Sequence, residues 1–247
     1  MRIQRFLAEA GLGSRRACED LVRQGRVMIG AEVAALGATV DPRRDKVTVD
    51  GERVRLPRVR IYLAMYKPRG VITTARDQRG RPTVYELLPK LPVRVNPVGR
   101  LDFNSEGLLL FTNDGLLAHA LTHPSGAVER EYQVKIQGVV PEWAIEKVKR
   151  GVRLEDGLAR ATVCARVESG RVKTNTWLRV VVAEGRYREV RRMFGVLGFN
   201  VLKLKRVRFG PVLLGRMKPG EVRELVVAEV KALCECVGGQ EGRGDGQ

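Results

Sequence analysis

Residues 108–111, Leu-Leu-Leu-Phe, are apolar at every position, so a strand formed by them has no face suited to water. Such a strand is buried in the core. The segment just before it contains Pro97, Gly99 and Gly107, which restrict its path, and it also contains Asp102. The sequence therefore predicts a carboxylate held in a defined position beside the core.

The N-terminal region forms a pattern of its own. The predicted elements are helices at residues 2–10 and 14–25 and strands at residues 26–30 and 46–54. Ser14 is the expected N-cap of the second helix, and Asp50-Gly51 is a hairpin signal within the last strand pair. Pro57 interrupts both periodicities. We therefore interpret residues 1–56 as a small separate domain.

From residue 61 the pattern changes to strands and short helices in alternation. Strands are predicted at residues 61–66, 70–74, 107–113, 130–138, 175–185 and 200–210, and helices at residues 114–123, 141–151 and 187–198. Regular long crossover helices are missing, so we expect an α+β fold with a mixed, mainly antiparallel sheet flanked by helices. This domain is predicted at residues 61–232, followed by a disordered tail at residues 233–247.

The charge of the chain favours a polyanionic partner. There are 45 lysines and arginines against 28 aspartates and glutamates, a formal net charge of +17. Basic side chains near phosphates release condensed counterions, which makes nucleic acid the favoured partner. An anionic membrane is the alternative, but no basic amphipathic segment with bulky apolar anchors stands out.

Location and metal binding are also constrained. No stretch approaches the roughly 20 apolar residues of a membrane span, and charges interrupt the N-terminal residues 1–11, unlike a signal peptide. We expect a cytoplasmic protein and a monomer. The four cysteines are too few for a disulfide scaffold. Cys234 and Cys236 lack a second cysteine pair or a nearby histidine, so no metal site is predicted.

The two N-terminal helices are strongly basic on the faces turned away from their apolar sides. The arginines there are Arg2, Arg5, Arg15, Arg16, Arg23 and Arg26. Only Glu9, Glu19 and Asp20 oppose them. A solvated helix face is the common explanation for such a set, but the one-sided charge favours nucleic-acid binding.

Familiar catalytic motifs are missing from the sequence. It has no G-x-x-x-x-G-K-[ST], no H-E-x-x-H and no G-x-S-x-G. His119 and His123 fall near a predicted helix end, where capping or surface roles are commoner than catalysis. Arg-Leu-Asp is often a surface turn and Tyr132 is often an ordinary core aromatic. The restricted path around Asp102 nevertheless favours a functional carboxylate.

Two resemblances add to this interpretation. The segment RFLAEAGLGSRRACEDLVRQGRVMIG resembles the S-four-like RNA-binding domain, although Ile29-Gly30 stands where that domain usually has Asn-Gly. Behind it follow KPRG, GRLD, GLLLFTNDG, EREY and EGRYREVRRMF. In this order, and over residues 1–232, the chain resembles the ribosomal-RNA pseudouridine synthases of the RsuA/RluB group.

The resemblance implies roles for single residues. Asp102 matches the catalytic nucleophile, and Tyr132 matches a tyrosine against the target base. Arg191 matches an arginine that pairs with the aspartate, and Leu204 a position at the base pocket. An arginine about 4 Å away would stabilise a desolvated carboxylate by about 4 kcal/mol at an effective dielectric near 20. RNA contacts are predicted for Arg5, Arg15, Arg16, Arg23, Arg26, Arg100, Arg186, Arg188 and Arg192.

The chemistry implied is the isomerisation of one uridine in structured ribosomal RNA. It needs no cofactor and no metal, because no group is lost or gained and no redox change occurs. With EREY and the stretch GVRLEDG at residues 151–157, the chain resembles large-subunit more than small-subunit ribosomal RNA enzymes. A non-catalytic RNA-binding ribosome-assembly factor is the main alternative, and the set of Asp102, Tyr132 and Arg191 argues against it. A nucleoside or sugar hydrolase would require a second catalytic carboxylate and would not explain the net charge of +17.

Overall fold

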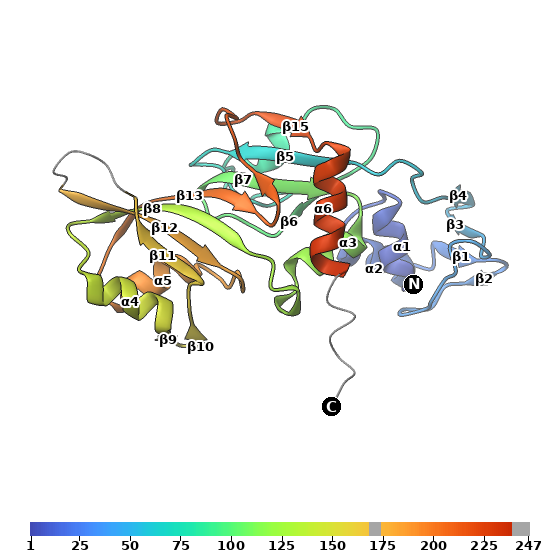
Figure 1. The fold of residues 1–247 in the computed structure, drawn as a ribbon. Coiled ribbons are helices and arrows are strands. Elements are labelled where there is room, and N and C mark those ends of the chain that lie inside the picture. The colour runs from blue at the N-terminus through green and yellow to red at the C-terminus, as the bar shows by residue number, and fades with distance from the viewer. Residues whose placement is uncertain (168–173, 239–247) are drawn as a thin grey trace. The chain divides into compact units, whose positions relative to one another are not determined.

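The structure of the protein is a computed structural model that describes residues 1–167 and 174–238 (Figure 1). The chain divides into two compact units. The N-terminal unit contains residues 1–61 together with residues 90–96, and the C-terminal unit contains the rest of the described chain. The sequence pattern did not indicate that residues 90–96 belong with the N-terminal unit.

The N-terminal unit has two helices and a four-stranded antiparallel sheet in the order β2-β1-β3-β4. Its elements are α1 (Ile3–Glu9), α2 (Arg15–Arg23), β1 (Val27–Ile29), β2 (Glu32–Val33), β3 (Val47–Val49) and β4 (Glu52–Val54). Ser14 caps α2, since its hydroxyl accepts a hydrogen bond of 3.1 Å from the Ala17 amide. Asp50 and Gly51 both have positive φ and form the turn between β3 and β4. The predicted helices and hairpin are confirmed.

The C-terminal unit is built on a nine-stranded sheet. Its main order is β11-β12-β8-β13-β7-β5-β15, with β14 paired to β13 and β6 paired to β7. The strands are β5 (Tyr62–Lys67), β6 (Asn96–Val98), β7 (Glu106–Thr112), β8 (Arg130–Gln137), β11 (Val163–Arg166), β12 (Asn175–Val182), β13 (Val201–Phe209), β14 (Val212–Leu213) and β15 (Val222–Glu224). Strands β13 and β7 are parallel, whereas the other pairs along the main order are antiparallel. The expected mixed, mainly antiparallel sheet is confirmed.

Burial along the strands follows their place in the sheet. Strand β7 lies between β5 and β13, and all its residues from Gly107 onward are buried. The buried strand predicted from the apolar run at residues 108–111 is confirmed. In β8 the buried positions alternate, with Tyr132, Val134 and Ile136 on the buried face.

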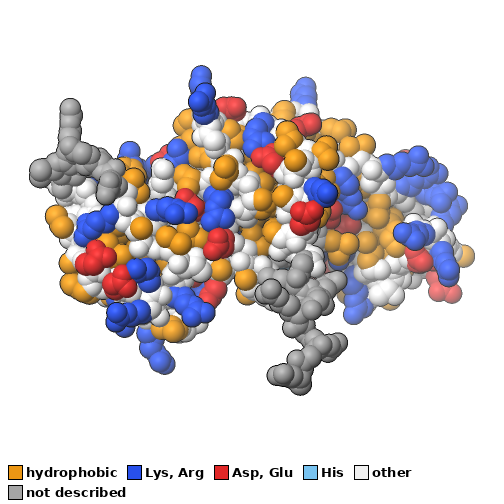
Figure 2. All heavy atoms as spheres, viewed as in Figure 1, with side chains coloured by type: hydrophobic (Ala, Val, Ile, Leu, Met, Phe, Trp, Pro, Cys, Tyr) orange, Lys and Arg blue, Asp and Glu red, His pale blue; other side chains and the backbone are white. Residues whose placement is uncertain are grey.

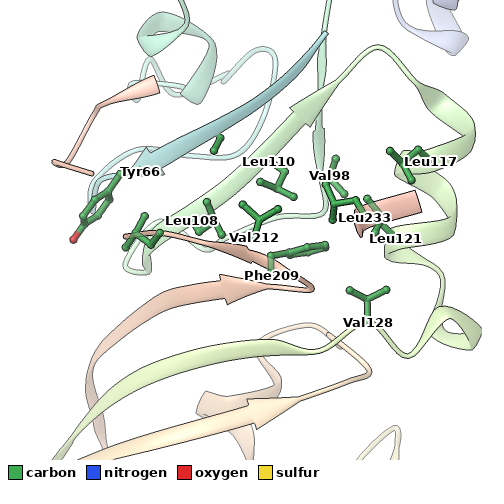
Figure 3. Packing of buried hydrophobic residues seen from close by; sticks show 12 residues of the cluster. Tyr66, Val98, Leu108, Leu110, Leu117, Leu121, Val128, Phe209, Val212 and Leu233 are labelled. Atoms are coloured by element: carbon green, nitrogen blue, oxygen red, sulfur yellow. The ribbon is translucent and has the colours of Figure 1, made fainter. Parts of the chain in front are cut away.

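Helices pack at two ends of this sheet. They are α3 (Gly115–Thr122), α4 (Glu142–Arg150), α5 (Glu189–Val196) and α6 (Val227–Gly238). Helices α3 and α6 lie beside each other, whereas α4 contacts β11 and α5 contacts β13 (Figure 1). Leu108 and Leu110 of β7, Phe209 of β13, Leu117 of α3 and Leu233 of α6 form one apolar core (Figure 3).

Helix α6 corrects the prediction of a disordered tail at residues 233–247. The helix continues to Gly238, and Leu233 is only 1% exposed. The apolar side chain of Leu233 packs into the core of the unit and so anchors the end of this helix. The sequence pattern did not reveal this contact. Residues 239–247, the remainder of the predicted tail, lie outside the described residues.

The strand predicted at residues 70–74 is also wrong. Ile72 forms one isolated bridge with Thr83, so the segment pairs at a single position and is otherwise a loop. A separate hairpin of β9 (Val152–Leu154) and β10 (Gly157–Ala159) was not predicted. Among the described helices, none has the length and apolar character needed to cross a membrane.

The parallel contact between β7 and β13 depends on Gly107. This residue pairs with Arg206 and has a φ of +108°. A Cβ atom on Gly107 would lie 2.2 Å from the Arg206 carbonyl oxygen and 2.7 Å from the Arg206 nitrogen. Glycine is therefore needed for the two backbones to approach each other.

We expect Gly107→Ala to lower the free energy of unfolding by about 3 kcal/mol, from main-chain overlap and an unfavourable φ together. Urea denaturation followed by circular dichroism measures the loss. Gly220→Ala is the matched control, because Gly220 has a φ of +86° and open space around its Cβ position. Its cost should be about 1 kcal/mol. Equal losses in the two variants would show that the strand contact does not depend on Gly107.

Candidate active site

Three residues predicted to act on the target base line one cavity of about 230 Å³. Asp102 precedes β7, Tyr132 lies in β8 and Leu204 lies in β13. Three arginines predicted to contact RNA line the same cavity: Arg100, Arg186 and Arg188. Because β13 pairs with both β7 and β8, the sheet brings these separate parts of the chain together.

The loop that carries Asp102 is held by Lys67, the last residue of β5. Lys67 is 0% exposed, and its ammonium group donates hydrogen bonds to three main-chain carbonyl oxygens. These belong to Pro68 at 3.0 Å, Asp102 at 3.0 Å and Ser105 at 2.8 Å. The three N–H donors of the ammonium group are thus all used. Two of the three bonds fix the backbone of the Asp102 loop.

Burial lowers the pKa of Lys67 to about 8, and the negative charge of Asp102 opposes this shift. Lys67 therefore remains largely protonated at neutral pH. Sequence reasoning missed this residue, although a signal was present: a lysine ends the apolar strand YLAMYK directly before Pro68.

The carboxylate of Asp102 forms an ion pair with Arg188. The Arg188 Nη1 atom lies 3.7 Å from Oδ2 of Asp102, and both side chains are partly exposed to solvent. Arg188 occupies the N-cap position of α5 with a φ of +47°. The guanidinium beside the carboxylate therefore comes from the residue just before the helix.

No ion pair within 4.0 Å joins Arg191 to Asp102 in this structure, so their predicted pairing stays a prediction. Arg191 donates hydrogen bonds to the carbonyl oxygens of Val201 at 2.8 Å and Asn104 at 3.1 Å. Burial, followed by the nearby charge of Arg188, lowers the pKa of Arg191, while Asp102 acts in the opposite direction. Arg191 thus connects the Asp102 loop to β13 through main-chain bonds.

Tyr132 and Leu204 supply apolar surface to the cavity. Both side chains are buried, and their strands are neighbours in the sheet. Tyr132 pairs with Val180 of β12 and with Arg206 of β13. The strand ladders therefore fix the backbone of Tyr132 on both sides.

Buried charged residues also line the cavity, and the sequence analysis missed them. They are Arg130, Arg206 and Glu189. The arginines bond to main-chain carbonyl oxygens, which belong to Ala183 and Leu121 for Arg130 and to Leu108 for Arg206. Burial lowers the pKa of Arg130 and raises the pKa of Glu189. The available signal was an arginine two residues from Tyr132 and another two residues from Leu204, on the same strand faces.

The predicted RNA-binding arginines of this unit have different environments. Arg186 donates to the carbonyl oxygens of Asp156 and Leu158, and Arg192 forms an ion pair with the Asp156 carboxylate. These two arginines hold the β9–β10 hairpin. Arg100 is exposed and has no ion pair within the described part of the chain.

The arginines predicted to bind RNA in the N-terminal unit are partly engaged with acids. The pairs are Arg5–Glu9 at 2.7 Å, Arg23–Asp20 at 2.6 Å and Arg26–Asp50 at 2.5 Å. Such surface pairs contribute about 0–1 kcal/mol, so a phosphate competes with them readily. Arg15 and Arg16 are exposed, and no described carboxylate lies within 4.0 Å of them. Lysine and arginine side chains recur over the face shown in Figure 2.

No metal cluster is found in residues 1–167 and 174–238, where no three His, Cys, Asp or Glu side chains are placed to hold an ion. The rings of His119 and His123 have centroids 5.2 Å apart, and His123 Nδ1 lies 2.7 Å from the Ser125 hydroxyl. Neither histidine lines the cavity.

Comparison with known families covers both units. Residues 61–195, which contain Asp102, Tyr132 and Arg188, match the family described as RNA pseudouridylate synthase. The match extends over more than half of the chain. The protein belongs to the RNA pseudouridylate synthase family. Residues 1–45 match the S4 domain.

Relatives support the family assignment. A Pseudomonas aeruginosa protein named ribosomal large subunit pseudouridine synthase B is 45% identical over 243 residues, covering 96% of this chain and 62% of that protein. A Bacillus subtilis protein of the same name is 38% identical over 233 residues, covering 94% of this chain and 95% of that protein. The crystal structure of a pseudouridylate synthase aligns with a TM-score of 0.66 and 26% identity, over 94% of this chain and 99% of that one. This chain thus spans less than two thirds of the Pseudomonas relative and nearly all of the Bacillus relative.

Lys67 should make stability depend on pH in the alkaline range. Its pKa is about 8 in the folded protein and 10.5 in its ordinary state. Between these values the unfolded chain binds more protons, so this group adds stability as pH rises, up to about 3 kcal/mol. We expect the unfolding free energy of the wild type, relative to Lys67→Met, to increase between pH 8 and pH 10.5 in urea denaturation.

The control for this measurement is Lys205→Met. Lys205 is half-buried, with its ammonium group 4.9 Å from the ring centroid of Tyr66. The unfolding free energy of the wild type, relative to Lys205→Met, should not increase in this way between pH 8 and pH 10.5. A wild-type advantage over Lys67→Met that stays constant across this pH range would contradict the buried ammonium group.

Proposed function

We propose that this protein isomerises a uridine of ribosomal RNA to pseudouridine, with Asp102 as the catalytic carboxylate. The observation that carries the proposal is the ion pair of Asp102 with Arg188 at 3.7 Å, in a cavity also lined by Tyr132 and Leu204. The carboxylate faces a space for a ligand, its backbone is held by Lys67, and one guanidinium lies beside it. These are the features that a reacting carboxylate requires.

The reaction breaks the bond between N1 of uracil and C1′ of ribose, turns the base, and forms a bond between C5 and C1′. N1 gains a proton and C5 loses one, so the composition of the RNA is unchanged. Asp102 acts either as a nucleophile or as the base that removes a proton, and both roles require its ionised form. A bound base excludes water and disfavours a charge, whereas Arg188 favours the charged carboxylate.

The walls of the cavity offer contacts to the uracil base. Tyr132 offers the uracil a flat face, and stacking of a base on an aromatic ring contributes about 1–3 kcal/mol. Leu204 adds apolar contact from the neighbouring strand. The uridine must first leave its stack in the RNA, which costs a few kcal/mol. Contacts of basic side chains with phosphates offset this cost.

We infer that the substrate is a single uridine of the large-subunit ribosomal RNA, modified in the cytoplasm by a monomer. Support comes from the two relatives named as large-subunit enzymes and from the basic N-terminal S4 domain. Phosphate contacts position a protein without reading sequence. The choice of uridine therefore depends on RNA structure and on contacts near the cavity.

Tritium release from RNA labelled at C5 of uridine tests the activity. Release by the purified protein supports the isomerase, and its absence at stoichiometric protein would favour a non-catalytic assembly factor. Carbodiimide and primer extension then map pseudouridines in RNA from a strain lacking the gene. A site missing only from small-subunit or transfer RNA would overturn the proposed substrate and leave the chemistry intact.

Asp102→Asn should abolish tritium release and change RNA affinity little, because asparagine keeps the shape of the side chain but cannot ionise. Single-turnover tritium release and filter binding measure the two effects. Glu155→Gln is the matched control, since Glu155 is an exposed acid outside the cavity lining. Retention of even a tenth of wild-type activity by the asparagine variant would exclude Asp102 as the catalytic group.

Arg188→Gln and Arg191→Gln should have opposite profiles. Loss of Arg188 should slow turnover at least about tenfold, equivalent to about 1.4 kcal/mol of charge stabilisation, with little change in folding stability. Loss of Arg191 should lower the unfolding free energy by about 1–3 kcal/mol, because the carbonyls of Asn104 and Val201 lose their donor. Tritium release and urea denaturation separate the two effects. The reverse pattern would identify Arg191 as the functional partner of Asp102.

Tyr132→Phe should retain base stacking, whereas Tyr132→Leu should fold and lose at least about tenfold in kcat/KM. The reason is that leucine fills the strand position without a flat face for the uracil. Tritium release measures turnover, and urea denaturation checks that both variants fold. Wild-type activity in the leucine variant would mean that Tyr132 serves only the core.

A further inference from the structure

A second cavity, of about 700 Å³, opens beside the first. Its lining comes from the loop at residues 72–81, from residues 100–103 and from Tyr187, and we call it the flanking groove. It shares Arg100, Leu101, Asp102 and Tyr187 with the cavity of the proposed reaction. The two spaces adjoin at the reactive carboxylate. The flanking groove is therefore within reach of the chain neighbour of a nucleotide held in the first cavity.

The flanking groove carries a surplus of positive charge. Its lining contains four arginines, Arg76, Arg79, Arg81 and Arg100, against Asp77 and Asp102. Asp77 is engaged by Arg81, whose guanidinium donates to the carboxylate at 2.9 and 3.1 Å. Arg76, Arg79 and Arg100 are exposed, and no carboxylate of residues 1–167 and 174–238 lies within 4.0 Å of them. Three guanidinium groups are thus free for phosphates.

The loop that carries these arginines is fixed to the Asp102 segment. The Thr73 hydroxyl donates to the Leu101 carbonyl at 2.8 Å and lies 3.3 Å from the Leu101 amide, which donates to it. Asp77 accepts further hydrogen bonds from the amides of Arg79 at 3.2 Å and Arg81 at 2.9 Å. The position of the arginines relative to Asp102 is therefore set by hydrogen bonds.

Two exposed aromatic rings line the same groove. Tyr187 is 65% exposed and Phe103 is 39% exposed. The carbonyl of Tyr187 accepts a hydrogen bond of 3.0 Å from Arg192, which also holds Asp156, so the backbone under the ring is restrained. An exposed ring next to unpaired arginines matches the combination with which proteins bind single-stranded nucleic acid.

We propose that the flanking groove binds the RNA nucleotide adjacent to the reacting uridine, with its base on the ring of Tyr187 and its phosphates at Arg76 and Arg79. The position of this nucleotide next to the uridine rests on the function proposed above. The ligand is single-stranded RNA, because a base in a duplex has both faces covered by its stacked neighbours. Arg100, shared by both cavities, lies where the connecting phosphate passes.

Variants of Tyr187 test the stacking contact. The probe is ribosomal RNA with uridine tritiated at C5, prepared from a strain lacking the gene. Tyr187→Ala should raise the KM for this RNA and weaken filter binding about tenfold, whereas Tyr187→Phe should remain within about twofold of the wild type. Trp143→Ala is the matched control, because Trp143 is 60% exposed on α4 and lines neither cavity. The proposal would be overturned if Tyr187→Ala and Trp143→Ala had the same KM for RNA and the same affinity in filter binding.

Variants of the arginines test the phosphate contacts. Arg76→Gln combined with Arg79→Gln should reduce the slope of log binding constant against log salt by about 1.4, since each single-strand contact contributes about 0.7. Arg216→Gln, at an exposed arginine outside both cavities, should leave the slope unchanged. An unchanged slope in the double variant would show that these arginines do not meet phosphates.

Binding does not require turnover, so the two proposals fail separately. If the wild type releases no tritium while the Tyr187 and arginine variants still weaken binding, isomerisation fails and the groove remains an RNA site. If the wild type releases tritium and these variants behave like their controls, the groove proposal fails and isomerisation stands. If Tyr187→Ala and the Arg76 and Arg79 double variant bind RNA as well as the wild type does, the groove is excluded as an RNA site, whatever the turnover.

Discussion

Three main-chain carbonyl oxygens, of Pro68, Asp102 and Ser105, converge on the buried ammonium group of Lys67. A charge in the protein interior has lost its hydration and is tolerated only when its donors are satisfied. The Asp102 loop supplies two of the three acceptors, so the burial of Lys67 and the shape of this loop depend on each other. Strand β5, which ends at Lys67, is in turn paired with β7, which begins just after the loop. The position of the Asp102 carboxylate therefore depends on one buried cation.

Several arginines of this protein donate hydrogen bonds to carbonyl oxygens of its own main chain. Arg130, Arg191 and Arg206 donate to carbonyl oxygens in or around the cavity, and Arg186 donates to those of the β9–β10 hairpin. The net charge of +17 consequently overstates the charge available to RNA. What remains exposed beside Asp102 is concentrated in the flanking groove and at Arg188. A basic composition indicates the class of partner, whereas the pattern of internal bonds decides where that partner can bind.

The sequence predicted several residues of the site, but it did not predict which arginine forms the ion pair with Asp102. Asp102, Tyr132 and Leu204 were all identified from motifs, and they line one cavity. Arg188 and Arg191 lie three residues apart, less than one helical turn of 3.6 residues, so the sequence pattern alone cannot separate their directions. The positive φ of Arg188 places it before the helix, where its guanidinium reaches Asp102, and Arg191 satisfies carbonyls instead. That difference depends on backbone geometry and on acceptors far away in the chain.

The sequence by itself determined the features that depend on near neighbours: the N-cap at Ser14, the turn at Asp50-Gly51 and the alternation of β8. It also determined that residues 108–111 form a buried strand, because no face of that strand suits water. Only the tertiary structure decided that residues 70–74 form a loop and that α6 continues past Leu233. Only the tertiary structure also showed that Lys67 holds the Asp102 loop. The physical reason is that burial of an apolar side chain and satisfaction of a buried charge depend on partners brought together from distant parts of the chain, which no local pattern contains.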